Sequence, residues 1–279
     1  MKVLVTGVSG QLGFDVMREL LARGIEVKGA SRSDFSLTDF AAMRRFVEAH
    51  RPTAIIHCAA YTAVDKAEDE PELCREVNAA ATGELARLAK EIGAKFLYIS
   101  TDYVFPGTGE DFYEPEDEKA PCNVYGESKL LGEEAALEAL EELFIVRISW
   151  VFGENGKNFI KTMLRLAETH EELSVVGDQI GSPTYTRDLA RLLADMIVTE
   201  KYGVYHATND GTCSWAELAK EALRCAGKKT RVKAIKTEEY PTKAKRPKNS
   251  RLSKKCLDDA GFSRLPDWRD AVARYVELI

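Results

Sequence analysis

The chain has 279 residues, 45% hydrophobic and 30% charged, which is typical of a globular protein with one large α/β unit or two interleaved lobes. Its formal net charge of -6 at pH 7 argues against a general binder of nucleic acid or of anionic membranes. The six cysteines include no CxxC pair, no His cluster has metal-ligand spacing, and no apolar run reaches the ~18 residues of a membrane span. The N-terminus enters a strand at once, without the regions of a signal peptide. We therefore expect a cytoplasmic protein with reduced thiols.

Short β-rich runs and amphipathic stretches alternate through the first half of the chain. The expected strands are residues 2–6, 25–30, 54–57, 95–100 and 144–148. The expected helices are residues 11–23, 38–50, 71–92 and 124–140, with Thr38 as the cap of the second. Such alternation predicts an α/β protein with a doubly wound, parallel, Rossmann-like sheet. We assign residues 1–150 to a dinucleotide-binding domain.

Beyond Trp150 the alternation becomes irregular. The expected helices are residues 158–169, 187–199, 214–226 and 268–278, and the expected strands are residues 173–176 and 203–207. Ser214 and Glu217 form a Ser-x-x-Glu capping box at the start of the third of these helices. The segment 243–255 is basic and interrupted by proline, which indicates a loop or arm. We expect a smaller, partly interleaved, mainly substrate-binding domain over residues 151–279, with about 180–207 returning to the cofactor domain.

A glycine-rich turn, GVSGQLG at residues 7–13, joins the first strand to the first helix. Glycine at these places permits a tight turn, the close approach of a pyrophosphate and tight packing of helix on sheet, and the helix N-terminus faces the anion. A glycine pattern alone is a weak signal, but a strand before it and a helix after it provide the confirming context. The residues predicted to bind a dinucleotide here are Gly7, Gly10, Gln11, Leu12 and Gly13.

The end of the second strand lacks the Asp or Glu that would hold the ribose 2′-hydroxyl of NAD. Ser31 and Arg32 stand there instead, and they suit the 2′-phosphate of NADPH. NADPH is therefore the expected cofactor, and NADH is the alternative if Arg32 is only a solvated loop residue. Asp34 and Phe35 are placed to approach the adenine.

Tyr125 and Lys129 are four residues apart on an expected helix and therefore share one face. A free phenol has a pKa near ~10 and a useful general acid or base works near ~7, so an ammonium that favours phenolate would help to tune it. For an isolated YxxxK match, a packed tyrosine and a solvated lysine are the commoner meaning. Thr101 changes this interpretation, because it ends the fourth strand at the sheet edge where ligands bind, so its hydroxyl can meet the phenol.

Together these features resemble the extended short-chain dehydrogenase/reductases, and more narrowly the dTDP-4-dehydrorhamnose reductase family. The narrower resemblance spans nearly the whole chain. It rests on HCAAYTAVDKAE at 57–68, STDYVF at 100–105, RISWVFG at 147–153, DQIGSPTY at 178–185 and RPKNSRL at 246–252. The glycine turn and YxxxK are common to the superfamily, whereas AAYTAVDKAE and STDYVF are much more specific to this branch.

This resemblance implies NADPH-dependent reduction of the 4-keto group of dTDP-6-deoxy-L-lyxo-4-hexulose to dTDP-L-rhamnose. Hydride would leave the nicotinamide for the ketone carbon, Tyr125 would protonate the oxygen, and Thr101 would hydrogen-bond it. Lys129 would ease proton loss from Tyr125 and hold the nicotinamide ribose. Further cofactor contacts implied after the third strand are Ala60, Tyr61 and Thr62.

The resemblance also implies a set of substrate contacts: Val64, Thr101, Asp102, Tyr103 and Trp150. Arg246 suits the diphosphate, because a planar guanidinium engages phosphate bidentately. Structural alternatives remain for two aromatic residues, since Trp150 would also suit packing between lobes and Tyr103 would suit the core. Lys243, Lys245 and Lys248 are expected to form a solvated basic face.

Four further points concern the resemblance. Asn78 resembles an asparagine that supports the active-site lysine, with a helix-surface role as the alternative. His57 and Cys58 replace the asparagine and small residue of many relatives, which casts little doubt on cofactor binding. Family members carry a divalent ion such as Mg at a dimer contact, for which Asp15 is a candidate, and we leave the metal unassigned. A homodimer is expected from the family alone, with no nucleic-acid or membrane partner.

Two alternatives to the reductase stay open. One is another sugar-nucleotide enzyme on this scaffold, such as an epimerase or a 4,6-dehydratase. Dehydratases of this kind carry Thr-Asp-Glu, and Tyr103 occupies the Glu position here, which favours simple reduction. The other is a non-catalytic regulatory subunit, like that of methionine adenosyltransferase. Intact Thr101, Tyr125 and Lys129 favour an enzyme but also allow a retained, idle site.

Overall fold

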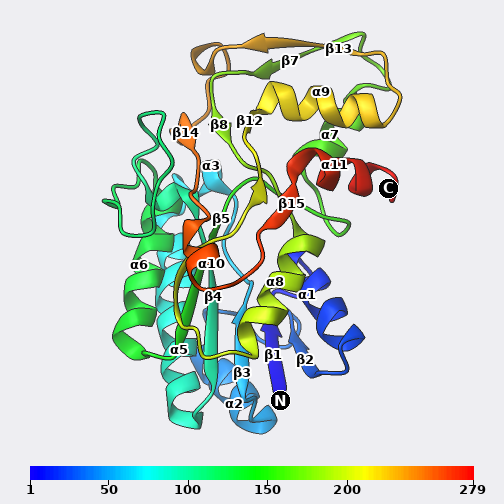
Figure 1. The fold of residues 1–279 in the computed structure, drawn as a ribbon. Coiled ribbons are helices and arrows are strands. Elements are labelled where there is room, and N and C mark those ends of the chain that lie inside the picture. Colours follow the sequence, from blue (N-terminus) through cyan, green and yellow to red (C-terminus); the bar gives the residue numbers. More distant parts are fainter.

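A six-stranded parallel sheet forms the centre of the molecule (Figure 1). The computed structural model describes every residue from Met1 to Ile279. The strands lie in the order β10-β5-β4-β3-β1-β2, and all neighbours are paired in parallel. Their bounds are β1 Lys2–Thr6, β2 Glu26–Ala30, β3 Ala54–His57, β4 Lys95–Thr101, β5 Leu143–Ile148 and β10 Gly203–His206. The predicted doubly wound α/β sheet is confirmed.

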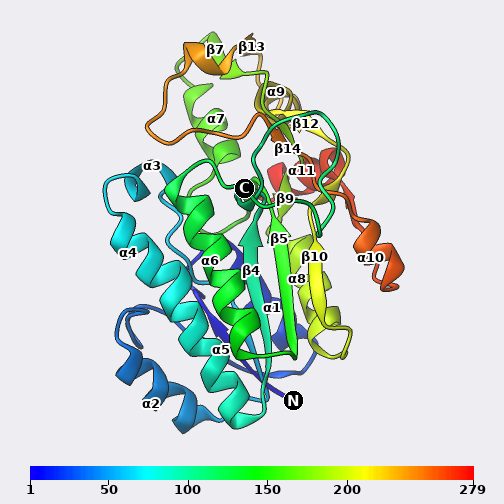
Figure 2. The ribbon, with the colours of Figure 1, turned by 90° about the vertical axis from the view of Figure 1, so that its left-hand side faces the viewer.

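Helices cover both faces of this sheet (Figure 2). On one face, α1 (Gln11–Ala22), α8 (Thr186–Ile197) and α10 (Lys255–Asp259) share an apolar core with the strands. On the other face, α2 (Phe40–His50), α5 (Ala81–Ile92) and α6 (Val124–Ala139) share a second core with them. Because both faces are covered, β3 and β5 are buried throughout, which explains their nearly continuous apolar sequences.

The second helix begins later than the sequence predicts. Its first residue is Phe40, and its cap is Asp39, whose carboxylate accepts the Ala42 N–H at 2.9 Å. Thr38 was the wrong choice, because its hydroxyl pairs with the Ser36 hydroxyl at 2.8 Å and leaves the helix to Asp39. Both residue types are good caps, so the sequence alone does not separate them.

The predicted helix over residues 71–92 is divided into three parts. An α-helix, α4 (Pro71–Arg75), leads into a π-helical turn, Glu76–Ala80, which continues into α5. π-Helical turns are rare and occur often at functional sites. Here the turn contains Asn78, whose side chain faces the site described below.

The C-terminal lobe is built around three helices, α7 (Phe159–Leu166), α9 (Trp215–Cys225) and α11 (Trp268–Val276), which share apolar clusters. The capping box of α9 is confirmed, since Ser214 and Glu217 bond each other's backbone N–H groups. The short strands of the lobe are β6 Val151–Phe152, β7 Glu172–Val176, β8 Ile180–Gly181, β9 Thr184–Tyr185, β11 Asn209–Asp210, β12 Cys213–Ser214, β13 Arg231–Ile235, β14 Asn249–Ser250 and β15 Leu265–Asp267. β13 was missed because three of its five residues are exposed, so no buried alternation marks it.

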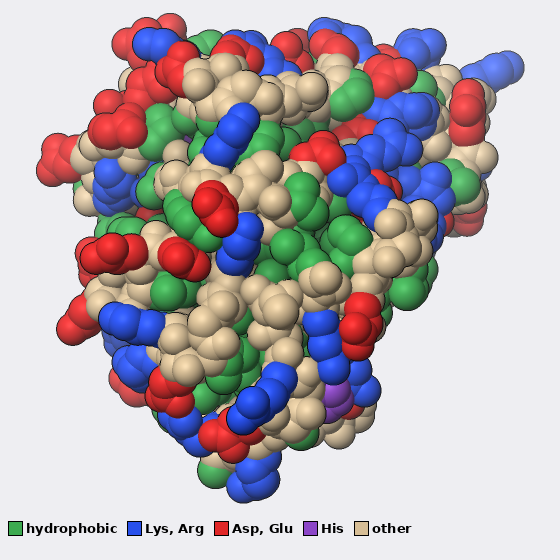
Figure 3. Space-filling view, turned by 60° about the horizontal axis from the view of Figure 1, so that its bottom comes forward, with side chains coloured by type: hydrophobic (Ala, Val, Ile, Leu, Met, Phe, Trp, Pro, Cys, Tyr) green, Lys and Arg blue, Asp and Glu red, His purple; other side chains and the backbone are tan.

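Two segments of the second half lie against the central sheet. β10 pairs with β5, and α8 packs along α1. A short helix, α3 (Val64–Ala67), and 3₁₀ turns at Asp102–Val104 and Thr237–Glu239 complete the structure. None of its helices combines the length and apolar character that a bilayer span requires. On the face nearest the start of the sheet strands, acidic and basic side chains are interspersed (Figure 3).

Candidate active site

The glycine turn leaves a cradle at the N-terminus of α1. Gly7 has a φ of +72°, and a Cβ there would lie 2.7 Å from the Ala59 nitrogen. A Cβ on Gly13 would lie 2.4 Å from the Gly7 carbonyl oxygen, so neither position has space for a side chain. The N-cap of α1 is Gly10, which offers no side-chain cap, so the first amides of the helix remain available to an anion. These features fit a pyrophosphate.

The C-terminal lobe holds this turn through two asparagines that the sequence analysis missed. Asn155 Nδ2 donates to the carbonyl oxygens of Ser9 at 2.8 Å and of Gly10 at 3.3 Å. Asn158 caps α7 and donates to Gln11 Oε1 at 3.1 Å. Neither residue lies in a recognisable motif, and only the approach of the lobes reveals the contact.

The segment after β2 contains exposed polar side chains and one buried aromatic side chain. Arg32 is exposed and makes no ion pair, which leaves its guanidinium free for a phosphate. Asp34 accepts hydrogen bonds from the Ser31 N–H and hydroxyl, both at 2.9 Å, and these bonds lower the pKa of its carboxyl. Phe35 is only 7% exposed and its ring packs 5.2 Å from Phe46, so little of it is open to an adenine.

Asn78 connects the loop after β3 with α6. Its side-chain oxygen accepts the Tyr61 N–H at 2.8 Å, and its Nδ2 donates to Ser128 Oγ at 2.9 Å. Asn78 is 1% exposed, so the helix-surface alternative is wrong. Tyr61 is itself buried and donates its hydroxyl hydrogen to Glu70, whereas the neighbouring Ala60 is half-buried and Thr62 is exposed.

His57 lies beneath this loop at the end of β3. Its Nδ1 pairs with the Thr6 hydroxyl at 2.7 Å, and burial lowers the pKa of the ring to about 3. Burial also raises the pKa of the adjacent Cys58 thiol to about 12. Both groups are therefore neutral at pH 7.

Thr101 and Tyr125 meet at the carboxyl edge of the sheet. Thr101 ends β4, and its hydroxyl donates to Asp102 Oδ1 at 3.0 Å. Tyr125 lies in the first turn of α6, where Asn123 caps the helix by accepting the Gly126 N–H at 2.8 Å. Burial raises the pKa of Tyr125, while the neighbouring Thr101 hydroxyl opposes that shift. The phenol therefore remains protonated at pH 7, as a proton donor must be.

Lys129 extends from α6 to the strand beneath it. Its ammonium donates to the Ile99 carbonyl oxygen at 2.7 Å and lies 4.0 Å from the centre of the Tyr98 ring. Burial lowers the pKa of Lys129 to about 7, although Glu133 opposes the shift. The Asp102 carboxylate raises the pKa of Tyr125 further. The ammonium is bound to the backbone of β4 in this arrangement, and the effect of Lys129 on the phenol stays a prediction.

Two of the predicted substrate residues, Asp102 and Tyr103, lie beside the phenol. The Tyr103 ring lies edge-on to Tyr125, with 5.6 Å between the ring centres. Asp102 is 3% exposed, and burial raises the pKa of its carboxyl to about 6. Val64 is half-buried at the start of α3.

Trp150 stacks on Trp215 with 3.9 Å between the ring centres and an angle of 18° between the planes. Its φ of +50° lies in the left-handed region, which is unfavourable for a bulky residue and occurs often at functional sites. The predicted packing between segments is therefore present, and the half-buried indole also keeps part of its surface open. Trp215 was missed, because nothing in its own sequence context distinguishes it from a core aromatic.

Arg246 lies on an arm that crosses from α3 to α6. Its Nη2 is 2.6 Å from Asp65 Oδ2, and Asp65 also accepts the Ala244 N–H at 3.0 Å. On the other side, Asn123 Nδ2 donates to the Lys245 carbonyl oxygen at 2.8 Å. Arg246 also lowers the pKa of Tyr103, against the larger effect of burial. The arm thus places a guanidinium beside the predicted sugar-nucleotide contacts.

Asp15 does not gather metal ligands within this chain. It is 1% exposed, accepts a hydrogen bond of 2.5 Å from Thr186 and lies 2.9 Å from Arg18. The structure contains no cluster of three or more His, Cys, Asp or Glu side chains suited to a metal ion. The residues around Asp15 do not fit a metal held by one chain.

The whole chain, residues 1–279, matches the family model described as RmlD substrate binding domain. The protein belongs to this family. It is 40% identical to the spore coat polysaccharide biosynthesis protein SpsK of Bacillus subtilis, over 99% of this chain and 97% of that protein. It is also 40% identical to dTDP-4-dehydrorhamnose reductase of Escherichia coli, over 98% of this chain and 96% of that protein.

Solved structures match the fold over nearly its full length. The dTDP-4-dehydrorhamnose reductase of Bacillus anthracis, in complex with NADP, has a TM-score of 0.97, 41% identity and coverage of 100% of this chain and 99% of that chain. UDP-glucose 4-epimerase of Thermus thermophilus has a TM-score of 0.83 at 22% identity over 99% of this chain and 98% of that chain, which shows a shared fold only.

Proposed function

We infer that this chain reduces the 4-keto group of dTDP-6-deoxy-L-lyxo-4-hexulose with NADPH and so forms dTDP-L-rhamnose. The observation that carries this inference is a protonated Tyr125 beside the Thr101 hydroxyl at the sheet edge, in a chain about 40% identical to dTDP-4-dehydrorhamnose reductases over nearly its whole length.

The cofactor fits the glycine cradle and the edge after β2. When bound, NADPH supplies the hydride. We propose that its pyrophosphate is held by Gly7, Gly10, Gln11, Leu12 and Gly13, because a side chain would fill the turn and none caps the first amides of α1. Ser31 and the unpaired Arg32 would hold the 2′-phosphate. Asp34, Phe35, Ala60, Tyr61 and Thr62 are proposed to shape the walls of this site.

Tyr125 is proposed as the proton donor. As the ketone carbon is reduced, its oxygen becomes a strong base, and a neutral phenol within hydrogen-bond reach can protonate it. A positioned acid of this kind contributes typically ~10²–10⁴-fold to a rate. Thr101 would donate a second hydrogen bond to the same oxygen as its negative charge grows.

Lys129 is proposed to hold the nicotinamide ribose and to ease proton loss from Tyr125 during the reaction. Its ammonium is already fixed on the Ile99 carbonyl, so little side-chain freedom remains to be lost when the ribose binds. Its pKa of about 7 allows it to gain positive character when anionic phosphates enter nearby.

The sugar nucleotide is proposed to lie between α3, α6 and the arm. Val64, Asp102, Tyr103 and Trp150 would contact it, and Arg246 would share its guanidinium between Asp65 and the diphosphate. The residue after Asp102 is Tyr103, whose pKa is raised by burial, so the acid that a 4,6-dehydratase uses there is lacking.

The proposal extends to the location, the oligomeric state and the domain division of the protein. We propose a cytoplasmic location, supported by six unpaired cysteines. We also propose a homodimer, and a division into residues 1–150 for the cofactor and residues 151–279 mainly for the substrate.

The test is a coupled assay with purified full-length chain and NADPH. The keto sugar is generated in situ by the upstream dehydratase and 3,5-epimerase, absorbance at the nicotinamide band is followed, and products are identified. We expect NADPH oxidation that requires the epimerase and yields dTDP-L-rhamnose. Oxidation without the epimerase would contradict the L-lyxo substrate, and no oxidation together with tight binding to another protein would favour a regulatory subunit.

A further inference from the structure

Glu133 lies one turn beyond Lys129 on α6 and is fully enclosed. Its side chain is 3% exposed and that of its partner, Arg147, is 2% exposed. Glu133 Oε1 accepts hydrogen bonds from Ser100 Oγ at 2.5 Å and Arg147 Nε at 2.9 Å. Glu133 Oε2 accepts a third from Arg147 Nη2 at 2.6 Å. The two oxygens of one carboxylate thus accept hydrogen bonds from side chains on two neighbouring strands, β4 and β5.

Those two strands lead directly into the candidate active site. Ser100 on β4 and Arg147 on β5 are register partners in the sheet. Ser100 precedes Thr101, and Arg147 lies three residues before Trp150. Glu133 is therefore bonded to the second-last residues of β4 and β5, shortly before the side chains proposed to meet the substrate.

We propose that Glu133 is a positioning residue for the reduction, which fixes α6 against β4 so that the Tyr125 and Thr101 hydroxyls converge on the same substrate oxygen. The reaction named in this inference rests on the proposed function, but the contact between α6 and β4 does not depend on it. Reacting groups displaced by about 1 Å can lose about 10²-fold in rate, so a rigid link between helix and strand has a kinetic consequence.

The ion pair between Glu133 and Arg147 supports a positioning role. A buried ion pair is weak evidence for stability, because well-packed apolar residues of similar volume often serve as well or better. Apolar contacts are not directional, whereas hydrogen bonds from a bidentate guanidinium and a hydroxyl fix both the distance and the angle at which the side chains meet. Arg147 is itself fixed by the Pro115 carbonyl oxygen, which accepts from Nη1 at 2.9 Å.

Other contacts hold the same stretch of α6 close to β4. Lys129 is bonded to the carbonyl of Ile99, the residue before Ser100. A Cβ on Gly132 would lie 2.4 Å from the Tyr98 hydroxyl oxygen, so the helix backbone already touches β4. Three consecutive residues of β4, Tyr98, Ile99 and Ser100, therefore contact α6 at Gly132, Lys129 and Glu133.

The charge of Glu133 also reaches the active site. The titratable and charged groups that face it are Lys129 on α6, Tyr98 on β4, Arg147 on β5 and Lys119 in the preceding loop. Glu133 raises the pKa of Lys129 against the larger effect of burial. Removal of its charge should therefore alter the pH profile of the reaction, which a purely structural residue would not do.

The test compares Glu133→Gln with Glu134→Gln, an exposed neighbour on the same helix. For E133Q we expect kcat to fall about 30-fold or more, while KM for the keto sugar and Kd for NADPH change by less than about three-fold. The pH at which kcat falls by half should move by at least about half a unit. E134Q should match the wild type in every measurement.

Because E133Q leaves a buried guanidinium unpaired, the double variant E133Q/R147Q removes both charges. A double variant that stays folded but retains the low kcat supports positioning. Recovery of wild-type kcat overturns it, since Glu133 would then serve only to neutralise Arg147.

Hydrogen exchange separates this inference from the proposed function. In E133Q/R147Q, peptides covering residues 97–103 and 124–133 should exchange faster than in the wild type, while peptides of α2 should not. Equal exchange in these segments overturns the inference. A wild-type chain that does not turn over the keto sugar counts against the proposed function alone, because exchange still decides whether Glu133 fixes the helix.

Discussion

The Lys129 ammonium donates a hydrogen bond of 2.7 Å to the backbone carbonyl of Ile99, although Tyr125 lies one helical turn before it. Spacing of four residues puts both side chains on one face, but the lysine extends to the strand beneath instead of to the phenol. The Tyr125 phenol therefore stays neutral beside the Asp102 carboxyl, and it can act as a proton donor.

Replacement of Tyr125 by Phe should abolish reduction of the keto sugar while leaving NADPH binding within about three-fold of the wild type. The phenol supplies the proton, and its loss should lower kcat by ~10²-fold or more. Stopped-flow or steady-state absorbance measures the turnover, and nucleotide fluorescence measures binding. Tyr240→Phe, at a site 60% exposed, is the control and should behave as wild type. Undiminished turnover in Tyr125→Phe would remove this residue from the mechanism.

Replacement of Arg32 by Ala should raise KM for NADPH far more than KM for NADH. Only NADPH carries the 2′-phosphate that the free guanidinium is placed to receive, and a lost charge-assisted contact is worth about 1.5–3 kcal/mol, or roughly 10- to 100-fold. Initial rates with each cofactor provide the ratio. Arg45→Ala, on the exposed face of α2, controls for loss of a surface charge. Equal effects on both cofactors would mean that Arg32 does not read the phosphate.

Replacement of Arg246 by Ala should raise KM for the sugar nucleotide by roughly 10- to 100-fold and leave Kd for NADPH unchanged, because the guanidinium is proposed to bind the substrate diphosphate. The wild-type KM should also rise with salt, and that dependence should weaken in the variant. Lys243→Ala is a matched control on the same arm, since Lys243 is exposed and pairs with Asp69. A KM for the nucleotide sugar that does not change in Arg246→Ala would place the diphosphate elsewhere.

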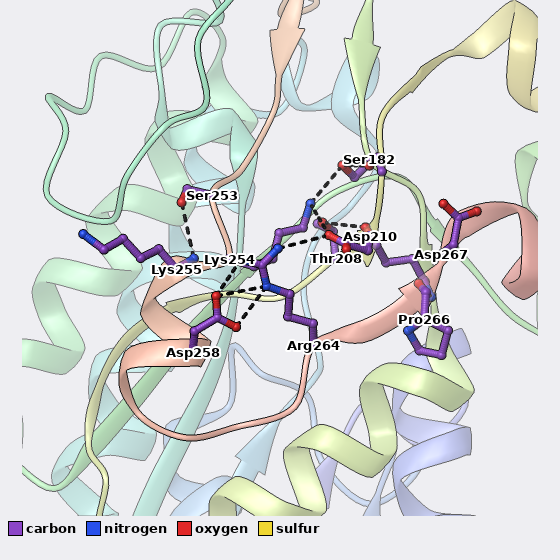
Figure 4. Close-up of polar contacts among 12 residues, drawn as sticks. Ser182, Thr208, Asp210, Ser253, Lys254, Lys255, Asp258, Arg264, Pro266 and Asp267 are labelled. Carbon is purple, nitrogen blue, oxygen red and sulfur yellow. Dashed lines mark hydrogen bonds and ion pairs between the residues drawn. The ribbon is translucent and has the colours of Figure 1, made fainter.

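Lys254 offers a prediction about stability. Its side chain is 4% exposed and reaches toward Ser182 Oγ at 3.4 Å and Asp210 Oδ1 at 4.0 Å (Figure 4). Burial lowers the pKa of Lys254 to about 8, against a partial opposing effect of Asp210, and Arg264 lowers it further. The unfolded chain therefore binds more protons between pH 8 and ~10.4, so the free energy of unfolding should rise with pH in that window.

Lys254→Met should therefore be more stable than the wild type at pH 7, by roughly 1–3 kcal/mol, and the difference should shrink as the pH rises toward 10. Urea unfolding at several pH values measures both effects. Lys255→Met removes an exposed charge from the adjacent position and should change the free energy of unfolding by less than about 0.5 kcal/mol. A Lys254→Met variant that is less stable at pH 7 would show that the ion pair with Asp210 outweighs the burial of the ammonium.

The sequence predicted the alternating elements of the sheet, the glycine turn and the convergence of Thr101 with Tyr125. One of its errors lies where two local solutions are equally good. Thr38 and Asp39 are both able caps, and the structure uses Asp39. β13 was missed for another reason, because three of its five residues are exposed and the strand depends on its pairing with β7.

By itself, the sequence determined which residues could share a face or a strand end, because a period of 3.6 or 2 residues relates neighbours within one element. Only the tertiary structure decided the partners that lie far apart in the chain. These include Trp215 beneath Trp150, Asp65 beside Arg246, and Glu133 bonded across two strands. Such contacts depend on how the elements pack and on which buried polar groups must find partners, and no local pattern encodes either.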